Sequence, residues 1–274
     1  MFRFDQLFVW NIRLGVIALI QTTQDGTSFY QFKNLAACRG IDHKIFSRHG
    51  GFSRGSYASL NVTFGIGDED GNVALNRGLI ARNMQARELV FARQVHGIDV
   101  AVLDQETRRP ESAAANPLTA DAMVTDQPQR HLVIQVADCQ AVFLFDPVRQ
   151  ATANVHCGWR GSVQNILGRT VDAMVQRFDC RPGNIIAGIG PSLGPCCAEF
   201  IHYQAEIPPA FWRYKDADNH FDFWSISSDQ LVQAGVAAKN IESSGICTRC
   251  HTDEFFSYRG EKTTGRFAAV IGML

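Results

Sequence analysis

Three short stretches of this sequence place a histidine or a cysteine at the end of an apolar run, beside glycine or an acid. They are Gln94–Gly97 with His96, Val136–Cys139 with Cys139, and Asn154–Gly158 with His156. Neutral imidazole and thiolate are good zinc ligands, and three protein ligands leave a fourth position for water or substrate. A bound zinc brings the pKa of water down to about 7 and so supplies a nucleophile near neutral pH. Spacing alone leaves two other interpretations open for each residue: a hydrogen-bonded core histidine and a buried inert thiol.

The elements that must position these residues alternate between strand-like and helix-like stretches, which favours a layered α/β fold. Apolar, β-branched and aromatic runs predict strands at Leu132–Val136, Ala141–Phe145, Ala151–His156, Ile185–Ile189 and Arg266–Met273. The runs Leu132–Val136 and Ala141–Phe145 are either two strands or one interrupted strand, with the polar residues Asp138 and Gln140 at the interruption. Helical spacing predicts helices over Val163–Phe178 and Gln230–Ala238, the first of them after a turn at Gly158–Ser162.

Composition indicates a folded chain with a sizeable core, since 46% of the 274 residues are hydrophobic and 19% are charged. The net charge of −1 argues against nucleic-acid and membrane partners, which favour a basic surplus. The apolar run Leu7–Ile20 is too short to cross a bilayer and fits a signal peptide poorly, so it predicts a strand or two of a cytoplasmic protein. Asp104–Pro117 has the composition of a surface loop.

Six motifs occur in order along the chain and together resemble the YfiH family, long labelled laccase-like or multicopper polyphenol oxidases and later purine nucleoside phosphorylases. They are Ser47–Ser53, Gln94–Gly97, Ala137–Cys139, Val155–Gly161, Gly190–Gly194 and Phe256–Arg259. The resemblance runs from about Ile45 to the C-terminus, and residues 1–44 contribute little. It implies a single YfiH-like domain over 1–274: a layered α/β sandwich with mixed sheets, related to the cytotoxic necrotizing factor catalytic fold.

The resemblance also implies a chemistry. His96, Cys139 and His156 match the family's zinc ligands, and the implied reactions are phosphorolysis of adenosine, inosine and methylthioadenosine, and deamination of adenosine. The substrates would then be a purine nucleoside and phosphate. This chain departs from the commonest family pattern at Gln140-Ala141 and at Cys157, and neither change removes a ligand.

Phosphorolysis needs a group that holds phosphate, and the planar fork of arginine suits it. Arg48 is the first candidate because Gly50, Gly51 and Gly55 permit close backbone approach, and Arg160 is the second. Either arginine has a structural alternative, such as stacking on Trp159 or tying down a turn.

Deamination needs a proton shuttle, for which Asp138 is the candidate. Its alternative is a carboxylate that caps a turn and orients Cys139. Weaker candidates are Asn61 for substrate binding, Asp121, and an aromatic group of Phe255, Phe256 and Tyr258, which would stack on a purine or belong to the core.

A second group of cysteines, Cys196-Cys197 and Cys247-x-x-Cys250, suggests a second metal site, although vicinal cysteines rarely bind one ion comfortably. A redox pair or a disulfide is an equal alternative.

Three other functions remain open at this stage. Copper-dependent polyphenol oxidation fits the old family label, but the chain has 8 histidines and no His-x-His pair. A cysteine-dependent amidase or peptidoglycan-editing hydrolase would use Cys139 as nucleophile and His96 or His156 as base. A metal-stabilised binding protein would have no catalytic activity.

Overall fold

A computed structural model describes residues 19–105 and 118–274 of the chain. The predictions for Leu7–Ile20 up to residue 18, and for residues 106–117 of the expected surface loop, lie outside the described residues. In the described ranges, no helix has both the length and the apolarity needed to cross a membrane.

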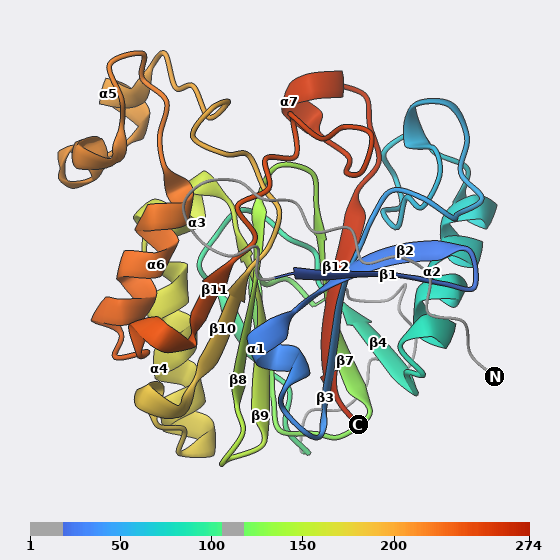
Figure 1. The fold of residues 1–274 in the computed structure, drawn as a ribbon, viewed down its shortest axis with the longest axis horizontal. Coiled ribbons are helices and arrows are strands. Elements are labelled where there is room, and N and C mark those ends of the chain that lie inside the picture. The colour runs from blue at the N-terminus through green and yellow to red at the C-terminus, as the bar shows by residue number, and fades with distance from the viewer. Residues whose placement is uncertain (1–18, 106–117) are drawn as a thin grey trace.

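Two six-stranded sheets pack face to face at the centre of the fold (Figure 1). The first sheet contains, in spatial order, β1 (Leu19–Gln24), β2 (Thr27–Phe32), β3 (Ile41–Phe46), β12 (Phe267–Met273), β7 (Arg130–Val136) and β4 (Glu88–Phe91). The second sheet contains β11 (Ile241–Ser243), β10 (Ile186–Ile189), β8 (Gln140–Asp146), β9 (Ala151–Cys157), β6 (Ala122–Thr125) and β5 (Val100–Val102). Both sheets mix parallel and antiparallel pairs.

Helices cover the outer faces of both sheets. The helix α2 (Asp70–Asn83) packs on the first sheet, and α4 (Ile166–Phe178) and α6 (Phe223–Gln233) lie over the second (Figure 1). The remaining short helices are α1 (Lys33–Ala36), α3 (Trp159–Val163), α5 (Tyr203–Glu206) and α7 (Tyr258–Glu261), with 3-10 turns η1 (Gly55–Tyr57), η2 (Pro182–Asn184), η3 (Pro209–Tyr214) and η4 (Ala238–Asn240). The expected layered α/β sandwich is therefore present.

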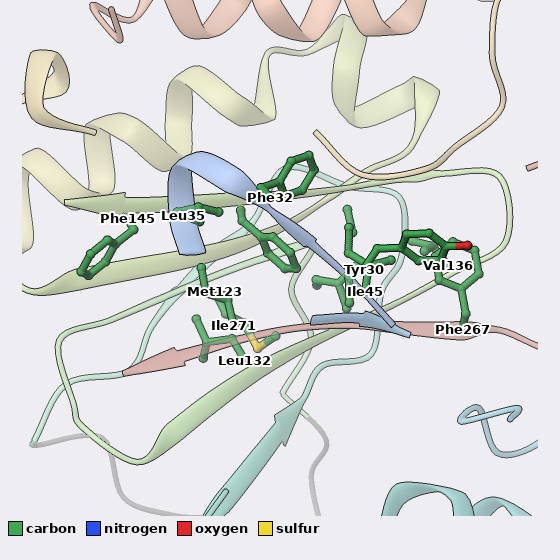
Figure 2. Close-up of a cluster of buried hydrophobic side chains, with 14 of the residues drawn as sticks. Tyr30, Phe32, Leu35, Ile45, Met123, Leu132, Val136, Phe145, Phe267 and Ile271 are labelled. Carbon is green, nitrogen blue, oxygen red and sulfur yellow. The ribbon is translucent and has the colours of Figure 1, made fainter. Parts of the chain in front are cut away.

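The core explains why the central strands read as continuous apolar runs. Successive side chains of a strand point to opposite faces of its sheet. In β8, Phe143 and Phe145 therefore enter the core between the sheets, while Val142 and Leu144 face the helical layer. Figure 2 shows the core between the sheets, where Met123 of the second sheet lies near Leu132 and Ile271 of the first. Because both faces of such strands are buried, alternation of polar and apolar residues is absent.

The structure resolves one open alternative and corrects two helices. The runs Leu132–Val136 and Ala141–Phe145 are two strands that belong to different sheets, so the intervening loop crosses from one sheet to the other. The predicted helix from Val163 instead begins at Ile166, because Asn165 adopts a left-handed conformation and its side chain accepts a hydrogen bond from the Gly168 amide. The predicted turn before it is the helix α3. The prediction over Gln230–Ala238 was wrong in its bounds, since α6 ends at Gln233 and the chain turns at Gly235 (φ 94°).

Candidate active site

Strand register brings Cys139, His156 and Asp121 together. The strands β8 and β9 are antiparallel, with Ala141 opposite His156, so Cys139, just before β8, lies beside the end of β9. On the other side of β9, the strand β6 pairs with Ala122 opposite Val155. That register places Asp121 next to His156.

His96 approaches from the loop after β4 and completes the group. It has a positive φ of 59°, and its backbone amide donates to Asp121 Oδ1 at 2.9 Å. The ligand atoms of His96, Cys139 and His156 all lie within 4.8 Å of one another, and His96 Nε2 is 3.8 Å from Cys139 Sγ. The three residues singled out from the sequence therefore converge at one point.

Gly158 makes room for this group. A Cβ atom at position 158 would lie 2.8 Å from His96 Cδ2 and 3.4 Å from Cys139 Sγ. Its φ is −74°, which any residue adopts, so the requirement is space and not backbone conformation. The convergence of two imidazoles and one thiolate at a point that only glycine leaves open fits the donor set of a three-ligand zinc site.

Asp121 fixes the orientation of His156. The carboxylate is fully buried, accepts from the Gly97 amide at 2.7 Å, and lies 2.7 Å from His156 Nδ1. Burial would raise the pKa of Asp121, but hydrogen bonds from His156 and Gly97 hold it below its ordinary value. An ionised Asp121 makes Nδ1 the donor and leaves Nε2 to face Cys139, as in carboxylate–histidine–metal arrangements.

The electrostatics favour a thiolate at Cys139. Burial would raise the pKa of this thiol, but the charge of His156 and hydrogen bonds from His156 and His96 lower it to about 6. Burial opposes the charge of His156, yet Cys139 and Asp121 raise its pKa to about 9. The neighbouring Cys157 behaves oppositely, since burial raises its pKa to about 11 and its sulfur contacts Ser162 Oγ at 3.2 Å. Of these two neighbouring cysteines, Cys139 is therefore the one prepared for metal binding or nucleophilic attack.

A cavity of about 750 Å³ opens onto this group, within the size range of small-molecule sites. Aromatic side chains form part of its wall: Phe64, Trp159, Phe200, Phe223 and Tyr258. Four arginines also line it: Arg77, Arg93, Arg259 and Arg266. The cavity thus combines flat apolar surfaces with positive charge beside the histidines and the thiolate.

Arg48, the first candidate for phosphate binding, is not among the residues that line the cavity. Its guanidinium donates to Ala58 O, Thr252 O and Glu261 Oε1, the last at 2.9 Å, and lies over the Phe256 ring. The nearby glycines do permit close approach, but to protein backbone, since a Cβ on Gly51 would lie 2.2 Å from Ser59 O. The structure thus places Arg48 where it ties loops together, and phosphate binding there gains no support.

The other predicted residues differ in their placement. Arg160 is exposed and stacks on Trp159 at 4.4 Å, outside the cavity lining. Asn61 is buried, and its Oδ1 accepts from the Arg266 amide at 2.9 Å, so it supports a cavity arginine without reaching the cavity. Asp138 does line the cavity.

The oxygens of Asp138 are already engaged. Thr248 Oγ1 and Ser257 Oγ each donate to Oδ1 at 2.7 Å, and the Arg259 amide donates to Oδ2. Asp138 also has a positive φ of 87°. These contacts match the orienting carboxylate that was the alternative to a proton shuttle.

Among the aromatic candidates, Phe255 and Phe256 are core residues, and Tyr258 alone lines the cavity. Sequence reasoning missed Arg266 and Arg77 and gave Asp121 little weight. One signal was available for Asp121, because an acid at the start of a fully apolar strand needs a buried partner. The two arginines carried no such signal.

The sequence of this chain matches a known family over most of its length. The sequence model of the family described as "Multi-copper polyphenol oxidoreductase laccase" matches residues 42–274. The chain belongs to this family. Its match begins close to the start of the resemblance seen in the sequence, at Ile45.

Relatives in this family carry a different name. The purine nucleoside phosphorylase of Bacteroides thetaiotaomicron is 32% identical over 241 residues, 83% of this chain and 89% of that protein. Purine nucleoside phosphorylase YfiH of Escherichia coli is 32% identical over 253 residues, 89% of this chain and 96% of that protein. The crystal structure of YlmD from Geobacillus stearothermophilus matches with a TM-score of 0.82 at 29% identity, covering 93% of this chain and 98% of that one.

Proposed function

We propose that this protein is a zinc-dependent purine nucleoside phosphorylase. The observation that carries the proposal is a three-ligand group on the wall of a cavity that also presents arginine and aromatic side chains. Two relatives that each align over more than four fifths of this chain are named purine nucleoside phosphorylases. The surroundings of His156 also support the proposal, because a buried carboxylate contacts its Nδ1, as is usual for metal-ligating histidines.

Zinc would be held by His96 Nε2, Cys139 Sγ and His156 Nε2. When bound, it would supply Lewis-acid stabilisation of negative charge at the cavity wall. The thiolate of Cys139 is already favoured, so its proton is not an obstacle to binding near neutral pH. Asp121 keeps His156 in the one tautomer that directs Nε2 towards the site.

Arg266 is the proposed phosphate-binding residue. Its Nη1 donates to Thr264 O and Gly265 O, which fixes the guanidinium on the cavity wall. Burial lowers its pKa from the ordinary value, while the charges of Cys139 and Asp138 oppose that change. Arginine remains cationic under such shifts and binds phosphate oxygens bidentately. It would hold phosphate against the anomeric carbon as positive charge develops on the ribose.

The purine would lie against the aromatic wall, where Tyr258 and Phe64 are partly exposed to the cavity. Flat rings stack on such side chains with little loss of side-chain entropy. Gln140, which departs from the family pattern, lines the same cavity, and its Oε1 accepts a hydrogen bond from Ser227 Oγ.

Deamination of adenosine ranks behind phosphorolysis in this proposal. It needs a group that carries a proton to the leaving amine, and Asp138 is the cavity carboxylate closest in sequence to a ligand. Both Asp138 oxygens already accept hydrogen bonds, two from hydroxyl groups and one from an amide. A carboxylate whose two oxygens are already occupied by these donors is poorly placed to carry a proton to the leaving amine.

A second candidate function rests on a specific observation. Cys139, His156 and Asp121 lie in the order thiolate, imidazole, carboxylate, which is also the arrangement of cysteine hydrolases. An amidase acting through this group would form a covalent adduct on Cys139 and would not need metal. Zinc that blocks alkylation of Cys139 would favour the phosphorylase, and an acylated Cys139 would favour the hydrolase.

The test is incubation of zinc-loaded protein with adenosine, with and without phosphate, followed by chromatography. Adenine that forms only with phosphate supports phosphorolysis, and inosine in either condition supports deamination. Phenol oxidation that depends on bound copper would overturn the proposal in favour of the activity in the family's description. Absence of any nucleoside product would overturn it as well.

A further inference from the structure

A second group of potential metal ligands lies outside the active-site group. Cys196, Cys197, Cys247 and Cys250 place all four sulfurs within 4.8 Å of one another. Cys250 Sγ is 3.6 Å from Cys196 Sγ and 3.6 Å from Cys197 Sγ. Four thiolates around a tetrahedral zinc at about 2.3 Å would be about 3.8 Å apart. The observed spacing is close to this value and far from the about 2.05 Å of a disulfide.

Backbone pairing explains how two distant segments present these sulfurs. A parallel bridge joins Ser192 to Cys247, with the Ser192 amide donating to Ile246 O at 3.1 Å and the Thr248 amide donating to Ser192 O at 3.0 Å. One segment then turns at Gly194, where the Cys197 amide donates to Gly194 O at 2.9 Å. This turn brings both vicinal cysteines towards the Cys247–Cys250 turn.

Glycine at position 194 permits the close approach. A Cβ there would lie 3.0 Å from Cys247 Cβ and 2.8 Å from the Trp224 ring. The amides of Gly194 and Cys250 both hydrogen-bond to the Cys247 sulfur. Amide donors directed at a sulfur favour a thiolate over a thiol, because a thiolate is the stronger acceptor. The backbone of both segments thus directs amide donors at this sulfur.

We propose that Cys196, Cys197, Cys247 and Cys250 bind one zinc ion in a closed, four-thiolate structural site. Four protein ligands leave no position for substrate, which separates this site from the three-ligand group in the cavity. Cys197 and Cys247 are buried, and Cys196 and Cys250 are exposed, so the ion would lie at the surface with its inner ligands in the fold.

The position of the site suggests what the ion stabilises. Leu193 donates its amide to Asp138 O at 2.8 Å, and Thr248 donates its hydroxyl to Asp138 Oδ1. The two cysteine segments therefore hold Asp138 from two sides, and Asp138 directly precedes Cys139. A zinc ion that clamps these segments would keep the loop of the active-site thiolate in place.

A disulfide is the competing arrangement. Cys250 is equally far from Cys196 and Cys197, so a disulfide at Cys250 would select one of them and leave Cys247 to pair with the other or stay reduced. A single zinc engages all four sulfurs.

The experiment is zinc analysis of the purified full-length chain and of three variants. Cys250→Ser removes an exposed ligand of the proposed site, and Cys139→Ser removes a ligand of the cavity group. Cys38→Ser is the matched control, because Cys38 is a half-buried thiol that belongs to neither group. We expect Cys250→Ser to hold one zinc fewer than the unaltered chain, and Cys38→Ser to hold the same amount.

Cys139→Ser keeps the proposal testable if Cys250→Ser fails to fold. It should retain one zinc, and cobalt bound in its place should show the strong charge-transfer absorption of several thiolate ligands. Equal zinc in Cys250→Ser and the unaltered chain would overturn the proposal. So would a chain two or four hydrogens lighter than its reduced mass, with one or two disulfides among Cys196, Cys197, Cys247 and Cys250. Neither result depends on the nucleoside reaction.

Discussion

The two groups of soft ligands in this protein differ in number, composition and surroundings. The cavity group has two imidazoles and one thiolate, with Asp121 behind His156. The four-cysteine group has sulfur ligands alone and lies where two segments meet. Three ligands beside a cavity leave a position open for chemistry, and four ligands close it. Ligand count and surroundings, more than ligand type, therefore separate a proposed catalytic site from a proposed structural one.

Among substitutions that affect the cavity group and not the four-cysteine group, Asp121→Asn should have the largest effect on activity. This substitution keeps the shape but removes the charge that orients His156, and such partners are worth about 10–100-fold in metal affinity or activity. We predict a loss of phosphorolysis in that range, with the zinc of the four-cysteine group retained. Activity and zinc content measured on the same sample check both parts. Unchanged activity would show that Asp121 has only a structural role.

Arg266→Met tests the charge on the cavity wall. Hydrogen bonds to charged groups contribute about 1.5–3 kcal/mol, so the KM for phosphate should rise by about tenfold or more while the KM for adenosine changes little. Arg160→Met is the control, since Arg160 lies outside the cavity lining and stacks on Trp159. An equal effect of both variants on phosphate would refute the assignment to Arg266.

Cys250→Ser should act on stability before activity. Loss of a zinc that clamps two segments removes folding free energy, and about 1 kcal/mol corresponds to roughly 2–4 °C in Tm for a domain somewhat smaller than this chain. We predict a Tm lower by several degrees, with less than a tenfold change in kcat/KM. Thermal unfolding and steady-state kinetics give the comparison. A large loss of kcat without a change in Tm would argue for a direct role in the reaction.

The last prediction concerns a buried histidine that belongs to neither group. Burial and the neighbouring Lys44 lower the pKa of His43 to about 3, opposite to the raised pKa of His156. Between about pH 6.5 and 3 the unfolded chain binds a proton at His43 that the folded chain does not. Folding stability from this group is therefore complete above pH 6.5 and is lost as the pH falls, by up to about 1.4 kcal/mol per pH unit.

Urea unfolding of the protein and of His43→Gln between pH 4 and 7 measures this slope. The variant should show a weaker dependence on pH whatever its absolute stability. Equal slopes in both proteins would contradict the assignment.

Parts of this architecture could be predicted from the sequence, for identifiable reasons. The strand Phe267–Met273 is apolar on both faces, and Ala151–Cys157 alternates apolar with polar residues, so the location of both strands could be predicted. Sheet order was not readable, because β7 and β8 are adjacent in sequence yet belong to different sheets. The chain crosses from one sheet to the other between β7 and β8, and Asp138 and Cys139 lie in this connecting loop. The expectation of one domain over 1–274 stays a prediction.

Some residues of the candidate site could be predicted from the sequence and others could not. The ordered motifs pointed to His96, Cys139 and His156, which the fold brings together. Asp121 depends on the register of β6 against β9, which composition does not encode. Arg48 was favoured because glycines surround it, but those glycines serve backbone packing, while Arg266 reaches the cavity from the edge of a core strand. A positive charge beside glycines was thus a poor indicator of a residue that lines the cavity, because the cavity is formed by the way the strands pair.

The central claim is that zinc at His96, Cys139 and His156 supports phosphorolysis. Its most direct test is a zinc titration of chelator-treated protein in adenosine and phosphate, with adenine formation and bound zinc measured together. Adenine formation should rise as zinc fills this site and should be absent from His156→Ala at every zinc concentration. Adenine formed at the same rate by the metal-free protein, or only after copper is added, would contradict the claim.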